Sequence, residues 1–118
     1  MFDRLEIFTL ANMQARHAAA RQSVVAQNIA NSDTPGFRAK DITEFGDILR
    51  DMQLRPERAR GDLSIRTHDA GTPASPNGNT VSLELEMLRG IEAQRAHSRA
   101  LRVYGSALEI LRTSLGRR

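Results

Sequence analysis

The sequence predicts a mainly α-helical protein in which two long terminal helices pair as a coiled coil, joined by a largely irregular middle segment. Three observations lead to this fold class. Residues 1–31 contain neither Gly nor Pro, whereas residues 32–80 hold all four Pro and five of the eight Gly. Residues 82–115 repeat apolar side chains in a heptad register for over four repeats, which is typical of paired helices. The length of 118 residues favours a single domain over residues 1–118.

An N-terminal helix is expected over about residues 3–31, because apolar and small side chains recur there at steps of three and four residues. The row formed by these steps is expected to face the partner helix and contains Leu5, Phe8, Asn12, Ala15, Ala19, Gln22, Ala26 and Ile29. A second, partly apolar face contains Ile7, Leu10, Met13, His17, Ala20 and Val24. Two such faces indicate a helix with neighbours on more than one side.

The segment after this helix has the residues of a helix stop and a turn. Asn31 is expected to take the left-handed conformation that commonly ends a helix. Pro35 and Gly36 fit the two central positions of a type II turn. Residues Asp41–Glu44 resemble a capping box, which predicts a short amphipathic helix from there to about Met52.

Residues 53–80 are predicted to be loop. Within them, Leu63–Thr67 alternates apolar and polar side chains and is a candidate short strand. Residues 70–80 are rich in Gly, Pro, Ser, Thr and Asn, a composition typical of a mobile segment.

A second long helix is expected over about residues 82–115. Ser82 is its candidate N-cap, and Glu84 and Glu86 suit the positive N-terminal end of the helix dipole. Its heptad row is expected to pair with the N-terminal helix and contains Leu83, Met87, Gly90, Gln94, His97, Leu101, Tyr104, Leu108, Leu111 and Leu115. Both rows weaken to small or polar residues in the middle, and the chain has no Trp and only 4% aromatic residues. We therefore expect the helices to need further neighbours, and the isolated chain to be disordered or weakly helical.

The net charge is +3, and the basic excess is almost entirely Arg, with sixteen Arg and a single Lys, Lys40. One interpretation of this bias is a solvated helix face with a basic C-terminal end that suits the helix dipole. The other is a functional surface, for nucleic acid, for an acidic partner or for ion pairs between subunits. Arg95, Arg99 and Arg102 share one helical face, but the near absence of Lys and of interleaved aromatic residues disfavours nucleic acid. We expect no nucleic-acid partner.

No constellation of residues for catalysis or metal binding is recognisable. The chain has no Cys, which excludes thiolate chemistry, disulfides and cysteine metal sites. The three His, at positions 17, 68 and 97, are far apart in sequence, and neither a nucleophile elbow nor a phosphate-binding loop is present. We expect no enzyme activity, no cofactor, no metal and no small-molecule substrate.

The sequence predicts neither a transmembrane helix nor a cleaved secretory signal. A membrane span needs roughly 20 mostly apolar residues, and no such run is present. Asp3 and Glu6 lie where the basic and apolar regions of a secretory signal would begin.

Two blocks of the sequence form recognisable motifs. Residues 28–37 read N-I-A-N-S-D-T-P-G-F, and residues 78–87 read G-N-T-V-S-L-E-L-E-M. In this order, flanking a short loop, they resemble the axial rod and hook proteins of the bacterial flagellum. The D-T-P-G form and the second block are similar to the proximal rod branch of that family. The residues that carry the first motif are Asn28, Ile29, Ala30, Asn31, Asp33, Thr34, Pro35, Gly36 and Phe37.

The resemblance implies a structural subunit of the proximal rod, which polymerises into the axial drive shaft of the basal body across the periplasm. It also implies export as an unfolded chain through the flagellar type III export apparatus, without a cleaved signal. The partners it implies are further copies of the chain, rod proteins of the FlgC type, the FliE adaptor and the membrane ring. The motif residues 28–31 and 33–37 are then expected to make subunit contacts.

A helical coiled-coil adaptor or a secretion chaperone outside the rod is the alternative function, and an Arg-rich nucleic-acid binder is a further one. An adaptor or chaperone is expected to be a folded dimer when purified, whereas a rod subunit is expected to be poorly folded alone. A nucleic-acid binder is expected to show steep salt dependence.

Overall fold

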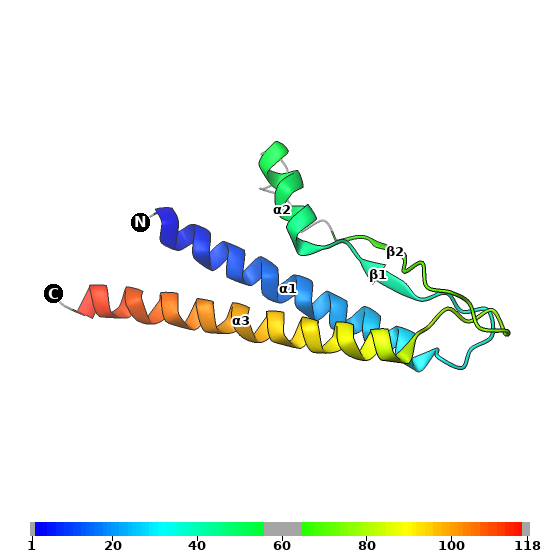
Figure 1. The fold of residues 1–118 in the computed structure, drawn as a ribbon. Coiled ribbons are helices and arrows are strands. Elements are labelled where there is room, and N and C mark those ends of the chain that lie inside the picture. Colours follow the sequence, from blue (N-terminus) through cyan, green and yellow to red (C-terminus); the bar gives the residue numbers. More distant parts are fainter. Residues whose placement is uncertain (1, 56–64, 117–118) are drawn as a thin grey trace.

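The computed structural model describes residues 2–55 and 65–116, and its dominant feature is a pair of long helices (Figure 1). Helix α1 spans Phe2–Ala30 and helix α3 spans Leu83–Gly116. The two helices run antiparallel and side by side, so both termini lie at one end of a slender molecule of 67 × 28 × 15 Å. The predicted fold class is confirmed, because two paired terminal helices flank one short helix and a small sheet.

The seam between the two helices is lined mainly by alanine at seven-residue intervals. Helix α1 buries Ala11, Ala18 and Val25, and helix α3 buries Ala93, Ala100 and Ala107 with Glu86 one heptad earlier. A seven-residue repeat keeps one row of each helix facing its partner. Small side chains in that row let the two backbones approach closely, so the seam depends on close contact rather than on bulky apolar residues.

The predicted pairing rows lie beside this seam, so the expected register was wrong by one row on both helices. Met87 and Leu101 are 62% and 54% exposed, and Ala19 is also exposed. The reason is that bulky and small side chains both repeat every seven residues, and the two helices bury the row of small ones. Of the other predicted pairing residues, Leu83, Leu115 and Ile29 are exposed, while Phe8, Ala15, Leu108 and Leu111 are half-buried. The side chain of Leu5 lies outside the described residues.

One aromatic contact joins the two predicted rows. The rings of Phe8 and Tyr104 meet edge to face, with centroids 5.0 Å apart. Because Phe8 lies on the predicted row of α1 and Tyr104 on that of α3, both rows border the seam on the same flank of the helix pair. The predicted rows therefore form one shared surface.

Two short strands form an antiparallel sheet in the middle segment. Strand β1 spans Lys40–Ile42 and strand β2 spans Thr67–Asp69, with Lys40 opposite Asp69 and Ile42 opposite Thr67. The candidate strand at Leu63–Thr67 is displaced, since only Thr67 belongs to β2. Its first residues, Leu63 and Ser64, lie outside the described residues.

Helix α2 spans Phe45–Leu54 and begins later than the predicted capping box. Glu44 is its N-cap residue and makes no side-chain hydrogen bond to the helix, and Asp41 belongs to β1 instead. The start of α2 is held by His17 of α1, whose Nε2 lies 2.6 Å from the Thr43 carbonyl oxygen. The His17 ring also packs on Phe45, with centroids 5.5 Å apart. From this anchor, α2 projects away from the helix pair (Figure 1).

Residues 70–80, predicted to be mobile, are held by backbone hydrogen bonds. Ser75 and Asn79 pair across a three-residue loop, with the Ser75 N–H donating to the Asn79 carbonyl at 2.8 Å. The Gly78 N–H donates back to the Ser75 carbonyl at 2.8 Å, and Gly78 has a φ of +84°. Pro at the first central position and Gly after the turn suit this loop type. The segment is also bound to residues 36–39, since the Ala70 N–H donates to the Ala39 carbonyl at 2.9 Å and the Thr80 N–H to the Phe37 carbonyl at 2.9 Å. Composition does not reveal these partners.

Candidate functional site

A cluster of buried polar side chains closes the end of the helix pair that lies opposite the termini. Asn28, Asn79, Thr80 and Glu86 are all buried there, and we call them and their hydrogen-bonded partners the junction. In the described part of the chain, every buried side-chain nitrogen and oxygen has a partner. Buried polar groups that are fully bonded fix one arrangement of the segments that supply them.

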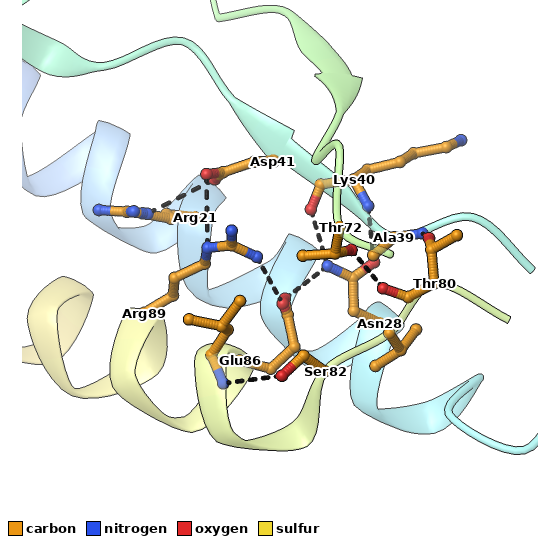
Figure 2. A network of polar contacts seen from close by, with 12 residues as sticks. Arg21, Asn28, Ala39, Lys40, Asp41, Thr72, Thr80, Ser82, Glu86 and Arg89 are labelled. Carbon is orange, nitrogen blue, oxygen red and sulfur yellow. Dashed lines mark hydrogen bonds and ion pairs between the residues drawn. The ribbon is translucent and has the colours of Figure 1, made fainter. Parts of the chain in front are cut away.

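Asn28 is the centre of the junction and joins α1 to β1 and α3 (Figure 2). Its Nδ2 donates to the Lys40 carbonyl at 2.7 Å and to Glu86 Oε1 at 2.6 Å. Its Oδ1 accepts the Lys40 N–H at 3.1 Å. The side-chain amide thus binds the Lys40 backbone as a neighbouring strand would. Its second N–H bond reaches the carboxylate of Glu86, in the first turn of α3.

Glu86 is 1% exposed, and its carboxylate pairs with Arg89 within a small ionic network that also contains Arg21, Asp41 and Glu92. Arg89 donates to Glu86 Oε2 at 3.1 Å and its Nε lies 3.6 Å from Asp41 Oδ2. Arg21 of α1 has its Nε 3.6 Å from Asp41 Oδ1 and its Nη1 3.6 Å from Glu92 Oε2. Figure 2 shows Arg21 and Arg89 converging on Asp41 above the Asn28–Glu86 pair. Removing either partner of such a buried pair leaves a charge without compensation.

Asn79 ties the end of α1 to the loop before α3. Its Nδ2 donates to the carbonyl oxygens of Asn31 at 2.8 Å and Thr34 at 2.7 Å. Its Oδ1 accepts the Val81 N–H at 2.8 Å. The carbonyls at a helix C-terminus lack partners within the helix, and Asn79 supplies one from the second motif. The two motifs of the sequence are therefore in direct contact.

Thr80 connects the loop before α3 to residues 37–39, which lead into β1. Its Oγ1 accepts the Ala39 N–H at 2.7 Å, and its own N–H donates to the Phe37 carbonyl at 2.9 Å. The Thr72 hydroxyl donates to the Thr80 carbonyl. Next along the chain, Ser82 caps α3 as predicted, since its Oγ accepts the Leu85 N–H at 3.4 Å.

The predicted type II turn at Pro35 and Gly36 is confirmed. The Phe37 N–H donates to the Thr34 carbonyl at 3.2 Å, and Gly36 has a φ of +74°. The Gly36 N–H also donates to the Asn77 carbonyl at 3.0 Å, which fastens the turn to the loop of residues 75–79.

The prediction for Asn31 is wrong, because glycines are the only described residues with a positive φ. Its side-chain amide instead donates to the Gln27 carbonyl at 2.9 Å, and its Oδ1 accepts the Thr34 hydroxyl at 3.2 Å. The helix therefore ends through side-chain bonds and not through a left-handed residue.

We expect Gly36→Ala to destabilise the junction by about 1 kcal/mol, because an L side chain at a φ of +74° is strained. No atom lies within 4 Å of an added Cβ, so the effect is one of backbone strain and not of crowding. Swimming in soft agar, in a strain that carries the variant as its sole copy, is expected to be reduced. Gly46→Ala in helix α2 is the control, because Gly46 also has open space around it and its φ is not positive. Full motility of the Gly36 variant would contradict the prediction.

The motif residues have unequal places in the structure. Asn28 is buried, and Asn31 and Phe37 are half-buried within the junction. The remaining motif residues are exposed at the end of α1 and at the turn, namely Ile29, Ala30, Asp33, Thr34, Pro35 and Gly36. Sequence reasoning recognised the second motif but missed Asn79, Thr80 and Glu86 as parts of one site; their position in that motif was the available signal.

An ion pair beside the junction joins Arg38, which precedes β1, to Asp69 of β2. Arg38 Nε donates to Asp69 Oδ2 at 2.6 Å, and the Gly71 N–H donates to Asp69 Oδ1 at 2.7 Å. The Arg38 hydrogen bond, followed by that from Gly71, lowers the pKa of Asp69. Asp69 is therefore ionised at neutral pH and links β2 to the segment before β1.

Residues 2–55 and 65–116 contain no group of three or more His, Asp or Glu side chains placed to hold a metal ion. None of the helices in these ranges is long and apolar enough to cross a membrane. What the arrangement does is mechanical: it fastens the end of α1, the strand segment and the start of α3 together.

The chain is similar to known flagellar proteins over most of its length. A family model described as flagella basal body rod protein matches residues 11–38. A flagellar basal body rod protein FlgB of Agrobacterium fabrum is 30% identical over 107 residues, covering 79% of this chain and 80% of that protein. FlgB of Salmonella typhimurium is 30% identical over 129 residues, covering 92% and 93%. FlgB of Escherichia coli is 41% identical over 54 residues, covering 45% and 39%.

Proposed function

We propose, since this chain belongs to the FlgB family of flagellar basal body rod proteins, that it polymerises with other rod proteins into the proximal part of the axial drive shaft. Membership of the family makes the chain a structural subunit of the rod, located in the flagellar basal body. The observation that carries the finer proposal is the presence of exposed apolar side chains on both flanks of the helix pair.

The first flank is the surface shared by the two predicted rows. Leu101 and Tyr104 of α3 are 54% and 43% exposed there, beside Phe8 of α1. They line a depression of about 580 Å³ that also reaches Met13 of α1 and Met52 of α2. We call this surface flank A.

The second flank lies across the seam, because the helical period places its residues on the opposite side of the alanine row. Val103 and Ile110 of α3 are 48% and 54% exposed, and Ile7 and Leu10 of α1 are 40% and 43% exposed. We call this surface flank B. Exposed apolar side chains clustered in this way are typical of interaction surfaces.

Flanks A and B are different surfaces, so a contact between them joins one copy to the next head to tail. Such heterologous contacts form rings when the rotation closes and open helical assemblies when it does not. Packing flank B of one subunit on flank A of the next would bury apolar side chains that are exposed in the single chain. This geometry favours a tubular polymer over a closed dimer.

We further propose that neighbouring subunits include rod proteins of the FlgC type, with the FliE adaptor and the membrane ring at the base. Delivery through the flagellar type III export apparatus into the periplasm is part of the same proposal. The alanine seam supports delivery as a weakly folded chain. Small side chains bury little apolar surface, so the helix pair gains little stability until neighbouring subunits cover its flanks. The motif residues 28–31 and 33–37 would then set the shape of the subunit from within the junction and present the exposed turn to neighbours.

We expect the purified chain to be a mainly disordered monomer at low concentration and to gain helix as the concentration rises. The reason is that helices this lightly packed depend on association for their stability. Circular dichroism and sedimentation on the same samples measure helix content and association together. A stable helical monomer or dimer, unchanged by dilution, would contradict the proposal and favour an adaptor or chaperone.

Ile110→Glu tests flank B within the same experiment, since a carboxylate there opposes burial against a neighbour. The variant is expected to lose the concentration-dependent gain of helix. Ser98→Glu adds the same charge at another exposed position of α3 and is the matched control, expected to behave as the unmodified chain.

A further inference from the structure

We propose that Asn77 is a self-modification site: the Asn77–Gly78 peptide deamidates spontaneously in the unfolded chain and is protected once the junction closes. Asn followed by Gly is the sequence most open to this reaction, because Gly has no Cβ to hinder attack on the neighbouring side chain. The chain has five Asn, and Asn77 alone precedes Gly.

The reaction needs only water and no oxidant or reductant. The Gly78 backbone nitrogen loses its proton and attacks the Asn77 side-chain carbonyl carbon, and the amide leaves as ammonia. The resulting five-membered succinimide adds water at one of its two imide bonds. Opening at one bond leaves an ordinary aspartyl residue at this position. Opening at the other leaves an isoaspartyl residue, whose main chain is longer by one carbon.

In the folded chain, the peptide unit that must rotate is held at both ends. The Gly78 N–H donates to the Ser75 carbonyl at 2.8 Å, and the Asn77 carbonyl accepts the Gly36 N–H at 3.0 Å. The Asn77 side-chain oxygen is also engaged, since it accepts the Asn79 N–H at 3.0 Å. Attack by Gly78 on Asn77 therefore requires local opening of the loop first.

The isoaspartyl product would not fit this loop. The three residues between Ser75 and Asn79 set the register in which Asn79 reaches Asn31 and Thr34. One extra main-chain carbon shifts Asn79 relative to both carbonyls. A chain that has aged while unfolded should therefore fail to close its junction, and this consequence for a subunit delivered unfolded rests on the proposed function.

The full chain is incubated in mildly alkaline buffer in two states, and conversion at each Asn is followed by peptide mass mapping with isoaspartate detection. One state is unfolded in guanidinium chloride. The other is made helical by raising the concentration or adding trimethylamine N-oxide, with circular dichroism recorded on the same sample.

In the unfolded chain, Asn77 is expected to convert first, ahead of Asn12, Asn28, Asn31 and Asn79. In the helical chain, its rate is expected to fall about tenfold or more, because two backbone hydrogen bonds must open before attack. Equal rates in the two states, or earlier conversion of another Asn in guanidinium, would overturn the proposal. The test remains decisive if the helical chain is a stable monomer, an outcome that contradicts only the polymerisation proposal.

Asn77→Gln is the matched variant for the folding consequence, since its longer side chain disfavours the five-membered ring and keeps an amide. After the same period in guanidinium and removal of the denaturant, the aged original chain is expected to recover less helix than a fresh one. The aged Asn77→Gln chain is expected to recover as much helix as its fresh counterpart. Equal losses in both chains would show that ageing acts elsewhere, and would overturn the folding consequence.

Discussion

Replacing Asn28 with alanine is expected to destabilise the folded chain by about 3–5 kcal/mol and to abolish motility, because three hydrogen bonds to buried or part-buried groups are lost. The substitution removes the Nδ2 donor from Glu86, a buried carboxylate that is then left with Arg89 alone. It also removes both bonds to the Lys40 backbone, so β1 loses its tie to α1. The cost is high because a buried carboxylate loses one of its hydrogen-bond donors while two main-chain groups lose their partners.

The unfolding midpoint in denaturant measures the effect, at a chain concentration where circular dichroism shows full helix. Complementation of a strain that lacks its own rod protein gives motility. Asn31→Ala is the control within the same motif, because the Asn31 amide donates only to Gln27 of its own helix; we expect about 1 kcal/mol or less. An Asn28→Ala chain with an unchanged midpoint would show that the junction does not stabilise the fold.

Ala100→Leu is expected to destabilise the helix pair by about 1–3 kcal/mol and to stop rod assembly. Ala100 is 1% exposed in the seam, so a larger side chain there must push α1 and α3 apart or adopt a strained rotamer. Separation of the helices would also displace both flanks, because residues from each helix form them. Unfolding midpoints and motility again give the measurement.

Ala19→Leu is the matched control for the unfolding midpoint of this substitution; motility is not compared, because Ala19 belongs to flank A. It makes the same change in volume at an exposed position of α1, where surface substitutions usually alter stability by less than about 0.5 kcal/mol. If Ala100→Leu were as stable as the control, the alanine row would not be the pairing surface.

The long helices could be predicted because their signals are local. The absence of Gly and Pro up to residue 31 and the cap at Ser82 act within a few residues of the positions they determine. The pairing row could not be predicted in the same way. Leu101 and Ala100 belong to rows with the same period, and only the partner helix decides which one is covered.

Only part of the junction could be predicted from the sequence. The turn at Pro35 and Gly36 follows from the conformational limits of those two residues, and the structure has it. The bond between Asn28 and Glu86 joins residues 58 positions apart, and nothing local marks them as partners. A left-handed residue commonly ends a helix, but bonds from Thr34 and Asn79 make that conformation unnecessary at Asn31.

The pairing of the first helix with the last has a consequence for the order of folding events. Helix α1 packs mainly on α3, with a smaller contact to β1, so its main partner lies far along the chain and follows it in synthesis. A chain that emerges from a channel with its N-terminus first cannot form these contacts until α3 has followed. Loop closure over such a distance is the slow, costly step of folding. In the export that we propose above, helix α1 therefore lacks its main partner until α3 has followed, and the junction can form only then.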